Sequence, residues 1–365
     1  MWYNMIILNL LEEFQEATRM KYQIDPQFIT DCFEEFVFTP SPVGYYVHTN
    51  PLLEKYGEML GCDVTFDNKH TGYITLDGED NSKTIMIGAH MDTIGMVVRR
   101  IDKDGAIRVR QLGGQNFYSL EGENVIVHTR DGREYTGILC CQSHSVHVFE
   151  DARTLPRNEE TMMILLDEPV KSKEDVQALG IMHGDMISAD PHYTLTENGY
   201  LKSRYIDDKA AVACALAAIK YLKENNLKPK YRTIFSFPYY EEIGHGGSYI
   251  PSEVSEYVCI DIGLIGPDND GNENAVSIAA KDFFSVYDYG LTTRLIEYAK
   301  KAECDFVVDT FFHYGTDGNA AIKAGYDIAH GAFGMAVYNS HGVERTHVDG
   351  LLNTVNLCLA YVLDI

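Results

Sequence analysis

The chain has 365 residues, 45% of them hydrophobic and 11% aromatic, enough to bury a full core in one large domain with a satellite or insertion. Its 30 basic and 54 acidic residues give a net charge of -24, which disfavours nucleic acid and anionic membrane surfaces as partners because both would be repelled. No segment approaches the roughly 20 apolar residues of a transmembrane helix, so no membrane span is expected.

The cysteines and the N-terminus bear on the cellular compartment. The eight cysteines form no CxxC pair and lie mostly in apolar runs, such as residues 212–215. Buried, reduced thiols are therefore expected, and with them a cytoplasmic location. The N-terminus lacks the basic start and the small-residue cleavage site of a signal peptide. Residues 1–20 are expected to form an appendage, in which Glu12, Glu13 and Glu16 indicate an amphipathic helix.

Helix starts and apolar runs organise the first 90 residues. Asp25-Pro26 predicts the N-cap and the first position of a helix, and Asn50-Pro51 predicts the same for a second helix. The continuous apolar run that ends in Ala89 is typical of a strand buried on both faces. The expected elements are helices over residues 26–38 and 51–61 and strands over residues 64–66, 73–76 and 83–89.

From about residue 95 to residue 187 the chain changes to short alternating segments separated by Asp-Gly turns, which predicts a small all-β module. The α/β pattern then resumes. Its expected elements are helices over residues 208–225, 292–302 and 350–363 and strands over residues 231–237 and 257–262. This order predicts one α/β sheet interrupted by a β insertion, rather than two sequential domains.

His90 and Asp92 directly follow the strand expected over residues 83–89. Two residues apart in an extended chain, their side chains leave on the same side. Asp92 can then accept a hydrogen bond from the His90 nitrogen that does not bind a metal, which would fix the tautomer. An H-x-D pair is a weak signal, and on its own a hydrogen-bonded strand-end histidine explains it better.

Asp207 and Asp208 stand at the start of an alanine-rich helix. Asp208 fits an ordinary N-cap. Asp207, one residue earlier, is then free to point elsewhere. A carboxylate has two oxygens and can bridge two cations about 3.5–4 Å apart, which is the spacing of dinuclear sites.

Glu241 and Glu242 follow the aromatic strand expected over residues 231–237. Adjacent side chains diverge near a strand end, so one carboxylate can bind a metal while its neighbour faces a metal-bound water. A surface pair would be the default on composition alone, but this pair terminates a buried strand. A purely structural metal site would have no use for the second carboxylate, so the pair indicates catalysis.

Asp261 and His341 complete the set of donors, although each alone would be assigned to a turn or a loop. Two divalent ions would bring four positive charges. Asp207, Glu242 and Asp261 with a bridging hydroxide would balance them, because histidine ligands are neutral. Such a balance avoids the cost of burying uncompensated charge, and it leaves Glu241 as an unligated general base.

With these motifs the chain resembles the M42 family of metallo-aminopeptidases, a group that also includes proteins labelled as endoglucanases and deblocking aminopeptidases. The resemblance covers about residues 25–365 and rests on several motifs in the order of the family. The motifs are Gly88-Ala89-His90-Met91-Asp92, Tyr205-Ile206-Asp207-Asp208-Lys209, Glu241-Glu242-Ile243-Gly244, Asp261-Ile262-Gly263, Gly315-Thr316-Asp317-Gly318, Asn339-Ser340-His341-Gly342 and Glu344-Arg345-Thr346-His347.

The resemblance implies a three-layer αβα catalytic domain, residues 21–95 and 188–365, with an inserted β-barrel-like dimerisation domain, residues 96–187. It implies Glu241 as the general base and Asp92 as a residue that supports a metal ligand. Two divalent ions are implied, zinc with cobalt or manganese as alternatives. Their ligands would be His90, Glu242, Asp261, His341 and a shared Asp207. Many members form twelve-subunit shells with inward-facing sites, which implies a homo-oligomer that acts on short peptides.

The expected reaction is hydrolysis of an N-terminal peptide bond, in which Glu241 takes a proton from the attacking water and delivers it to the leaving amine. Tyr240 stands where many relatives have a glutamine, and Gly342 stands where the family often has a serine. Both departures bear on which substrate side chain the enzyme prefers, not on the reaction. Three alternatives stay open: a metal-free glycoside hydrolase, another co-catalytic metal amidohydrolase or carboxypeptidase, and a noncatalytic metal-binding scaffold. Four histidines could serve either in packing or in substrate binding, namely His144, His147, His245 and His347.

Overall fold

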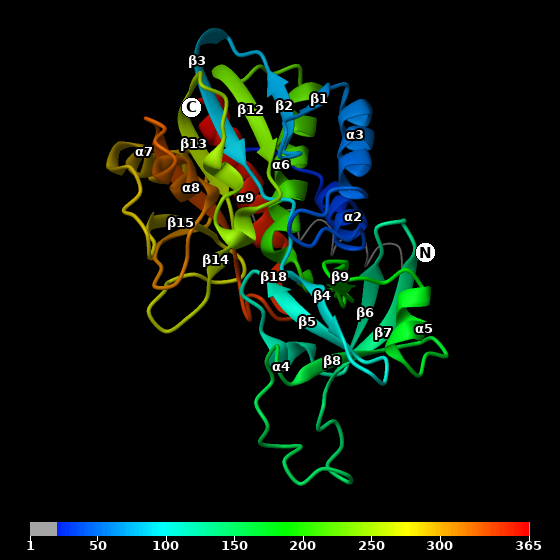
Figure 1. Cartoon of the computed structure of the whole chain (residues 1–365). Helices are drawn as coiled ribbons and strands as arrows, with labels where there is room; N and C mark the ends of the chain where they lie inside the picture. Colours follow the sequence, from blue (N-terminus) through cyan, green and yellow to red (C-terminus); the bar gives the residue numbers. More distant parts are fainter. Residues whose placement is uncertain (1–19, 365) are drawn as a thin grey trace, which may run out of the picture.

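The structure is a computed structural model that describes residues 20–364. Residues 1–19 and 365 lie outside the described residues, and so does nearly all of the expected N-terminal appendage. Figure 1 shows an α/β region formed by the beginning and the second half of the chain, with a β-barrel formed by the residues between them below it.

The α/β region is built on one large sheet. Within the described residues its strand order is β1-β2-β12-β3-β13-β17-β15-β16, and β14 pairs with β17 at one end. The central strands β12, β3, β13 and β17 run parallel, whereas β2 and β15 are antiparallel to their inner neighbours. The strands are β1 Val64–Phe66, β2 Gly72–Leu76, β3 Asp80–Gly88, β12 Tyr231–Phe237, β13 Val254–Ile260, β14 Gly263–Leu264, β15 Val276–Lys281, β16 Phe306–Thr310 and β17 Ala329–Val337.

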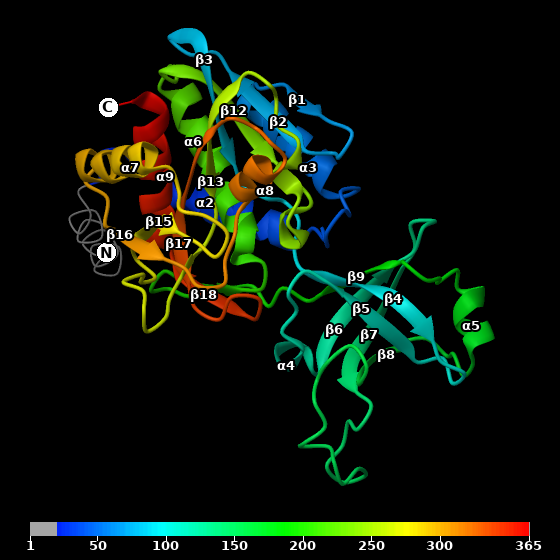
Figure 2. The ribbon, with the colours of Figure 1, turned by 60° about the vertical axis from the view of Figure 1, so that its left-hand side comes forward.

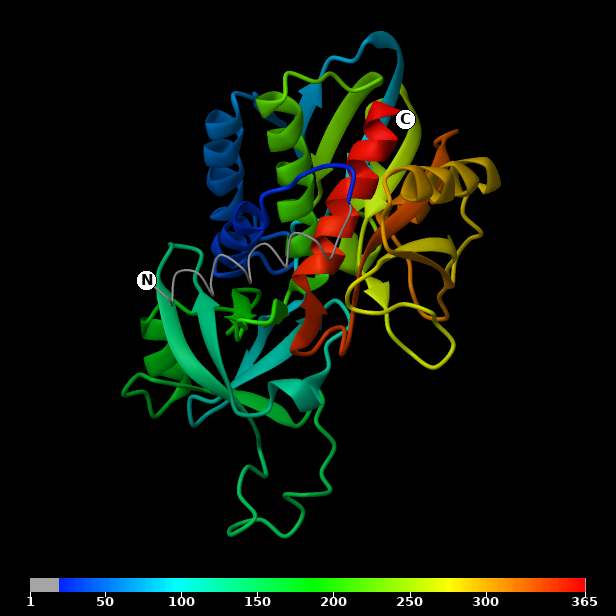
Figure 3. The same cartoon turned by 180° about the vertical axis from the view of Figure 1, so that it is seen from behind.

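Helices cover both faces of this sheet. Along β13, Val258 and Ile260 point into the core shared with α6 and α9, while Tyr257 and Cys259 point into a second core on the other face. Figure 3 shows α6 (green) and α9 (red) side by side over the first face. That face carries α2 Pro26–Val37, α3 Thr49–Leu60, α6 Ile206–Glu224, α7 Tyr289–Lys301 and α9 Val348–Leu363. The other carries α8 Asp317–Lys323 and two 3-10 turns, η1 Glu241–Ile243 and η2 Gly246–Ser248.

The middle of the chain closes into a barrel with its own apolar core. The strand order around it is β4-β5-β8-β7-β6-β9. Val98, Val109, Val127, Ile164 and Ile187 are fully or almost fully buried inside it. Figure 2 shows the barrel standing clear of the α/β region except at one end. Its elements are β4 Gly95–Ile101, β5 Ile107–Leu112, α4 Phe117–Leu120, β6 Glu123–His128, β7 Glu134–Cys141, β8 Met162–Leu166, α5 Lys173–Ala178 and β9 Met186–Ala189.

A small sheet next to the barrel joins two distant parts of the chain. It consists of β10 Thr194–Leu195, β11 Tyr200–Ser203 and β18 Glu344–His347. Ser203 pairs with Glu344 in this sheet. The start of α6 is thereby brought beside the loop that precedes β18.

Most of the predicted elements are confirmed, with small shifts at their ends. Asp25 caps α2 as expected, its side chain accepting a hydrogen bond from the Gln27 N–H. The cap predicted at Asn50 is wrong, because α3 already begins at Thr49. The helix ends at Leu60, one residue before the expected end at Gly61, whose backbone is left-handed. The prediction did not include β15, β16, α8 or β17. None of the described helices is long and apolar enough to cross a membrane.

Candidate active site

The predicted site residues gather at one edge of the large sheet. Because β3, β12, β13 and β17 are parallel, their C-terminal ends meet there, as ligand sites of α/β sheets commonly do. The residues that follow these four ends are His90, the pair Glu241 and Glu242, Asp261, and His341. Asp207 reaches the same place from the start of α6.

Of these residues, all but His90 line a cleft of about 740 Å³ between the α/β region and the barrel. Gly114, Gln115 and Asn116, which follow β5 of the barrel, contribute part of its wall. Phe284 and Lys323 line it on the α/β side. A substrate in this cleft would therefore touch both regions of the chain.

His90 is held by the backbone two residues further on. Its Nδ1 lies 2.9 Å from the carbonyl oxygen of Asp92. A carbonyl can only accept, so Nδ1 carries the proton and Nε2 is left facing Asp207, whose Oδ1 is 3.0 Å away. We expected the Asp92 carboxylate to make this bond, but its Oδ1 is 3.6 Å from Nδ1, beyond hydrogen-bonding distance.

The carboxylate of Asp92 instead holds the glutamate pair. Its Oδ1 accepts the backbone N–H of Glu241 at 3.1 Å, and its Oδ2 accepts that of Glu242 at 3.2 Å. Asp92 is fully buried, so these two bonds are not exchanged with water. The segment after β12 is thereby fixed against the segment after β3.

Asp207 lies between the two histidines. Its Oδ1 faces Nε2 of His90, and its Oδ2 lies 3.5 Å from Nε2 of His341. The Nδ1 atom of His341 donates to the carbonyl oxygen of Gly114 at 2.7 Å, so here too Nε2 is left free to face the carboxylates. The Oε2 atom of Glu242 lies 3.4 Å from the same Nε2.

Glu344 fixes the positions of Asp207 and His341 through their backbone. Its carboxylate accepts the backbone N–H groups of both residues at 3.0 Å. Glu344 is 1% exposed. Sequence reasoning gave it no role, although it lies three residues after His341 in one of the quoted motifs.

We expected the side chain of Asp208 to cap α6, but it does not do so. Its Oδ2 accepts the backbone N–H of His90 at 3.1 Å, and its Oδ1 is buried without a hydrogen-bond partner. The reason is the position of the chain, which enters α6 through non-helical backbone at Asp207 and Asp208 and turns this carboxylate toward β3 rather than along the helix. The sequence analysis placed Asp207 in the cluster and made Asp208 an N-cap, whereas in the structure both carboxylates belong to the cluster.

The donor atoms form two groups that share one residue. His90, Asp207, Asp208 and Asp261 offer atoms within 4.8 Å of one another, and so do Asp207, Glu242 and His341. Imidazole nitrogen and carboxylate oxygen are ligands that suit zinc and similar divalent ions. One oxygen of Glu242, Oε1, is buried with no hydrogen-bond partner, which leaves a lone pair that a cation would satisfy.

The electrostatics also fit bound cations. Burial is the main cause that raises the pKa of Glu242 to about 8 and that of Asp261 to about 7, and the Asp207 carboxylate adds to both. Burial disfavours a charged His341, but Glu242 and Asp207 outweigh it and raise its pKa to about 10. For His90 burial is again the largest single effect and lowers the pKa, but the surrounding carboxylates, Asp208 first among them, together outweigh it and raise the pKa. A cleft that draws protons onto so many buried groups would also attract divalent ions.

Asp317 is a further buried carboxylate that sequence reasoning quoted in a motif without a role. Its Oδ1 accepts the Gly247 N–H at 2.6 Å. Burial raises its pKa to about 7, and Asp92 adds to the shift.

The sequence analysis left the roles of four histidines open. His347 accepts the Asp349 N–H at the start of α9, and His245 stacks on Tyr240 with ring centroids 4.8 Å apart. His144 and His147 lie on the barrel loop after β7.

Comparison with known proteins identifies the family and the fold. The family described as M42 glutamyl aminopeptidase matches residues 71–357. The putative aminopeptidase YhfE of Bacillus subtilis is 39% identical over 333 residues, 91% of this chain and 96% of the relative. In fold, the chain is similar to a TET aminopeptidase from a marine sediment Thaumarchaeota archaeon, with a TM-score of 0.82 and 18% identity over 92% of this chain and 95% of that one. It is also similar to the TET1 peptidase of Pyrococcus horikoshii, with a TM-score of 0.81 and 22% identity over 92% and 100%.

The fold and the family match are those of a peptide hydrolase of the α/β class with an inserted barrel. The chain belongs to the M42 family of aminopeptidases. Members of this family depend on metal ions, in agreement with the two groups of donors at the sheet edge.

Proposed function

We propose that the protein is a dinuclear metal-dependent aminopeptidase that removes N-terminal residues from short peptides. One divalent ion would be held by His90, Asp207 and Asp261, and the other by Asp207, Glu242 and His341. The observation that carries the proposal is the shared Asp207, whose two oxygens face the two histidines separately. We propose zinc in both positions, with cobalt or manganese as alternatives, since all accept these nitrogen and oxygen donors.

Glu241 is the proposed general base. Its carboxylate belongs to neither group of donors, yet it lines the cleft and its Oε2 lies 3.8 Å from Nε2 of His90. Glu242, its neighbour in sequence, belongs to the second group. This division supports one ligand and one base in the pair. Burial raises the pKa of Glu241 well above its usual value, against the opposing effect of His90, which suits a group that must both take and release a proton.

When bound, the ions would polarise the scissile carbonyl and lower the pKa of water toward neutrality. Glu241 would take the proton of the attacking water and deliver it to the leaving amine. Asp92 keeps Glu241 in place through its backbone N–H. The negative charge of the carboxylates at this sheet edge would attract the free α-ammonium group of the substrate. This distinguishes an aminopeptidase from an enzyme that binds a C-terminal carboxylate.

The adjacent glutamates provide a matched test. Glu241→Gln should lower kcat on aminoacyl chromogenic substrates by about 10²- to 10⁴-fold, the usual contribution of a general base, while the metal content stays near that of the wild type. Glu242→Gln should lower the metal content as well, because it removes a ligand. Full activity of Glu241→Gln would refute the role of the base.

We further propose that copies of the chain assemble and that the barrel, residues 96–187, is the dimerisation module. The support is the likeness to the Pyrococcus horikoshii TET1 peptidase, which assembles into a tetrahedron or a large octahedral shell. Exposed apolar side chains on the barrel, among them Tyr118, Val148 and Met182, would be covered in such an assembly. Light scattering coupled to gel filtration should give a mass of several subunits, with a twelve-subunit shell as the proposed form.

We also propose a cytoplasmic location. The eight free cysteines, of which seven are buried, support it.

A further inference from the structure

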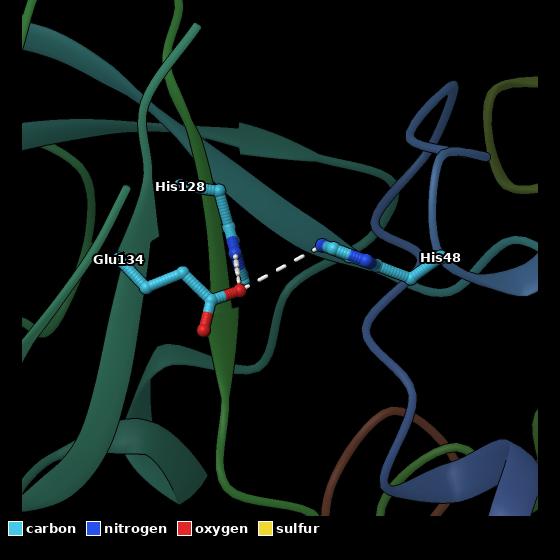
Figure 4. Close-up of side chains that lie close together, drawn as sticks. All are labelled: His48, His128 and Glu134. Carbon is cyan, nitrogen blue, oxygen red and sulfur yellow. Dashed lines mark hydrogen bonds and ion pairs between the residues drawn. The ribbon is translucent and has the colours of Figure 1, made fainter. Parts of the chain in front are cut away.

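A second type of donor cluster lies outside the cleft, where the barrel meets the α/β region. Figure 4 shows His48, His128 and Glu134 pointing toward one another. The Oε1 atom of Glu134 lies 3.0 Å from Nδ1 of His128 and 3.7 Å from Nε2 of His48. One donor atom from each residue falls within 4.8 Å of the other two.

The three residues come from both regions of the chain. His48 directly precedes α3 of the α/β region. His128 ends β6 and Glu134 begins β7, so both stand at one hairpin of the barrel. Whatever binds all three side chains would therefore tie the barrel to the α/β region at a point distinct from the cleft.

His128 is prepared to act as a ligand through Nδ1. It is buried, and its Nε2 lies 2.8 Å from the Oγ atom of Ser188 on β9. A proton on Nε2 that is donated to this hydroxyl leaves the Nδ1 lone pair directed at Glu134 and His48. Metal-bound histidines usually have such a hydrogen bond on the other nitrogen, because it fixes the tautomer and the ring.

The other two side chains leave room for an ion. The side chains of His48 and Glu134 are 47% and 48% exposed, so a metal could enter and keep a water ligand. The Oη atom of Tyr45 lies 3.1 Å from Nε2 of His48, and its ring packs on that of His128 with centroids 5.0 Å apart. The hydroxyl of Tyr45 would turn away when the lone pair of His48 binds a metal.

We propose that His48, His128 and Glu134 form a zinc-type site that fastens the barrel to the α/β region. Two imidazole nitrogens, one carboxylate oxygen and a water make a tetrahedral set for Zn²⁺. Ligands about 2.0–2.1 Å from the ion stand about 3.3 Å apart in a tetrahedron. This spacing is close to the 3.0 Å and 3.7 Å that separate Oε1 of Glu134 from the nitrogens of His128 and His48. The site would have a structural role and is independent of the two donor groups in the cleft.

Metal content at buffered free Zn²⁺ tests this directly on the full chain. The wild type should hold one equivalent of zinc more than His48→Gln and one more than Glu134→Gln, measured by plasma mass spectrometry after gel filtration. His147→Gln, which changes an exposed barrel histidine outside the cluster, is the matched control and should keep the wild-type content. Both cluster variants should retain peptidase kcat.

Two further variants separate this site from the cleft. Ser188→Ala should keep the three ligands and weaken zinc binding at the junction by about 10- to 100-fold, as expected when the hydrogen bond that orients a ligand is lost. Glu242→Gln should lose metal from the cleft and keep the junction equivalent. Equal zinc content in the wild type and His48→Gln, or the same loss in His147→Gln, would overturn the proposal.

Discussion

The position of the glutamate pair depends on Asp92, and Asp92→Asn tests this with a nearly isosteric change. The carboxylate of Asp92 accepts one N–H from Glu241 and one from Glu242. An asparagine retains a single acceptor oxygen and turns an NH2 group toward the other N–H. One charge-assisted bond is thereby lost, and two donors face each other in a fully buried place.

A hydrogen bond to a charged group contributes about 1.5–3 kcal/mol, so the glutamate pair should lose positioning energy of that size. Since about 1.4 kcal/mol corresponds to a factor of ten, kcat should fall by roughly 10- to 150-fold. KM should change less, because Asp92 does not line the cleft. Occupancy of the ion bound by Glu242 should also fall, since that ligand is displaced together with the base.

Asp309→Asn is the matched control for this prediction. Asp309 is also buried, and its carboxylate accepts the Asp270 N–H and the Ser277 hydroxyl, but it lies on the edge strand β16. Both variants should lose stability of similar size in urea unfolding, and only Asp92→Asn should lose kcat. A wild-type kcat for Asp92→Asn at full metal content would refute the reasoning.

Three other outcomes follow from the structure. Chelation of divalent ions should abolish peptide hydrolysis and lower Tm, and added zinc, cobalt or manganese should restore both; full activity in chelator would favour a metal-free mechanism with two carboxylates. Lys209→Met should destabilise the fold by about 2–5 kcal/mol in urea unfolding, because the buried Nζ donates to the carbonyl oxygens of Phe36 and Thr39, which would remain unpaired. Gly334→Ala should lose activity and stability, since a Cβ there would collide with the backbone oxygen of Asp261. Gly331→Ala on the same strand is the control and should have a mild effect, because the nearest atoms to its Cβ belong to leucine side chains. Equal effects of the two glycine variants on activity and stability would contradict this prediction.

The sequence was sufficient where a site residue follows a recognisable strand. His90, Glu241 and Asp261 each come directly after a long apolar run, and parallel strands bring such positions to one edge. It was not sufficient where long-range backbone contacts decide the role. Asp208 has the spacing of an N-cap, and only the approach of β3 to the start of α6 turns its carboxylate to the His90 N–H.

Glu344 was missed for a related reason. Its carboxylate serves two N–H groups, those of His341 three residues away and of Asp207 far away in the chain. Only the pairing of β11 with β18 brings the three residues together. No periodicity or local motif encodes such a pairing between strands of four residues each.

One backbone atom of the barrel orients a proposed metal ligand in the cleft. The Nδ1 atom of His341 donates to the carbonyl oxygen of Gly114, which belongs to the segment between β5 and α4. A Cβ at Gly114 would lie 3.1 Å from that same nitrogen, so glycine permits the close approach. If the barrel shifted against the α/β region, this bond would lengthen and the Nε2 atom of His341 would turn away from Asp207 and Glu242. The second donor group is therefore complete only while the barrel is held in place.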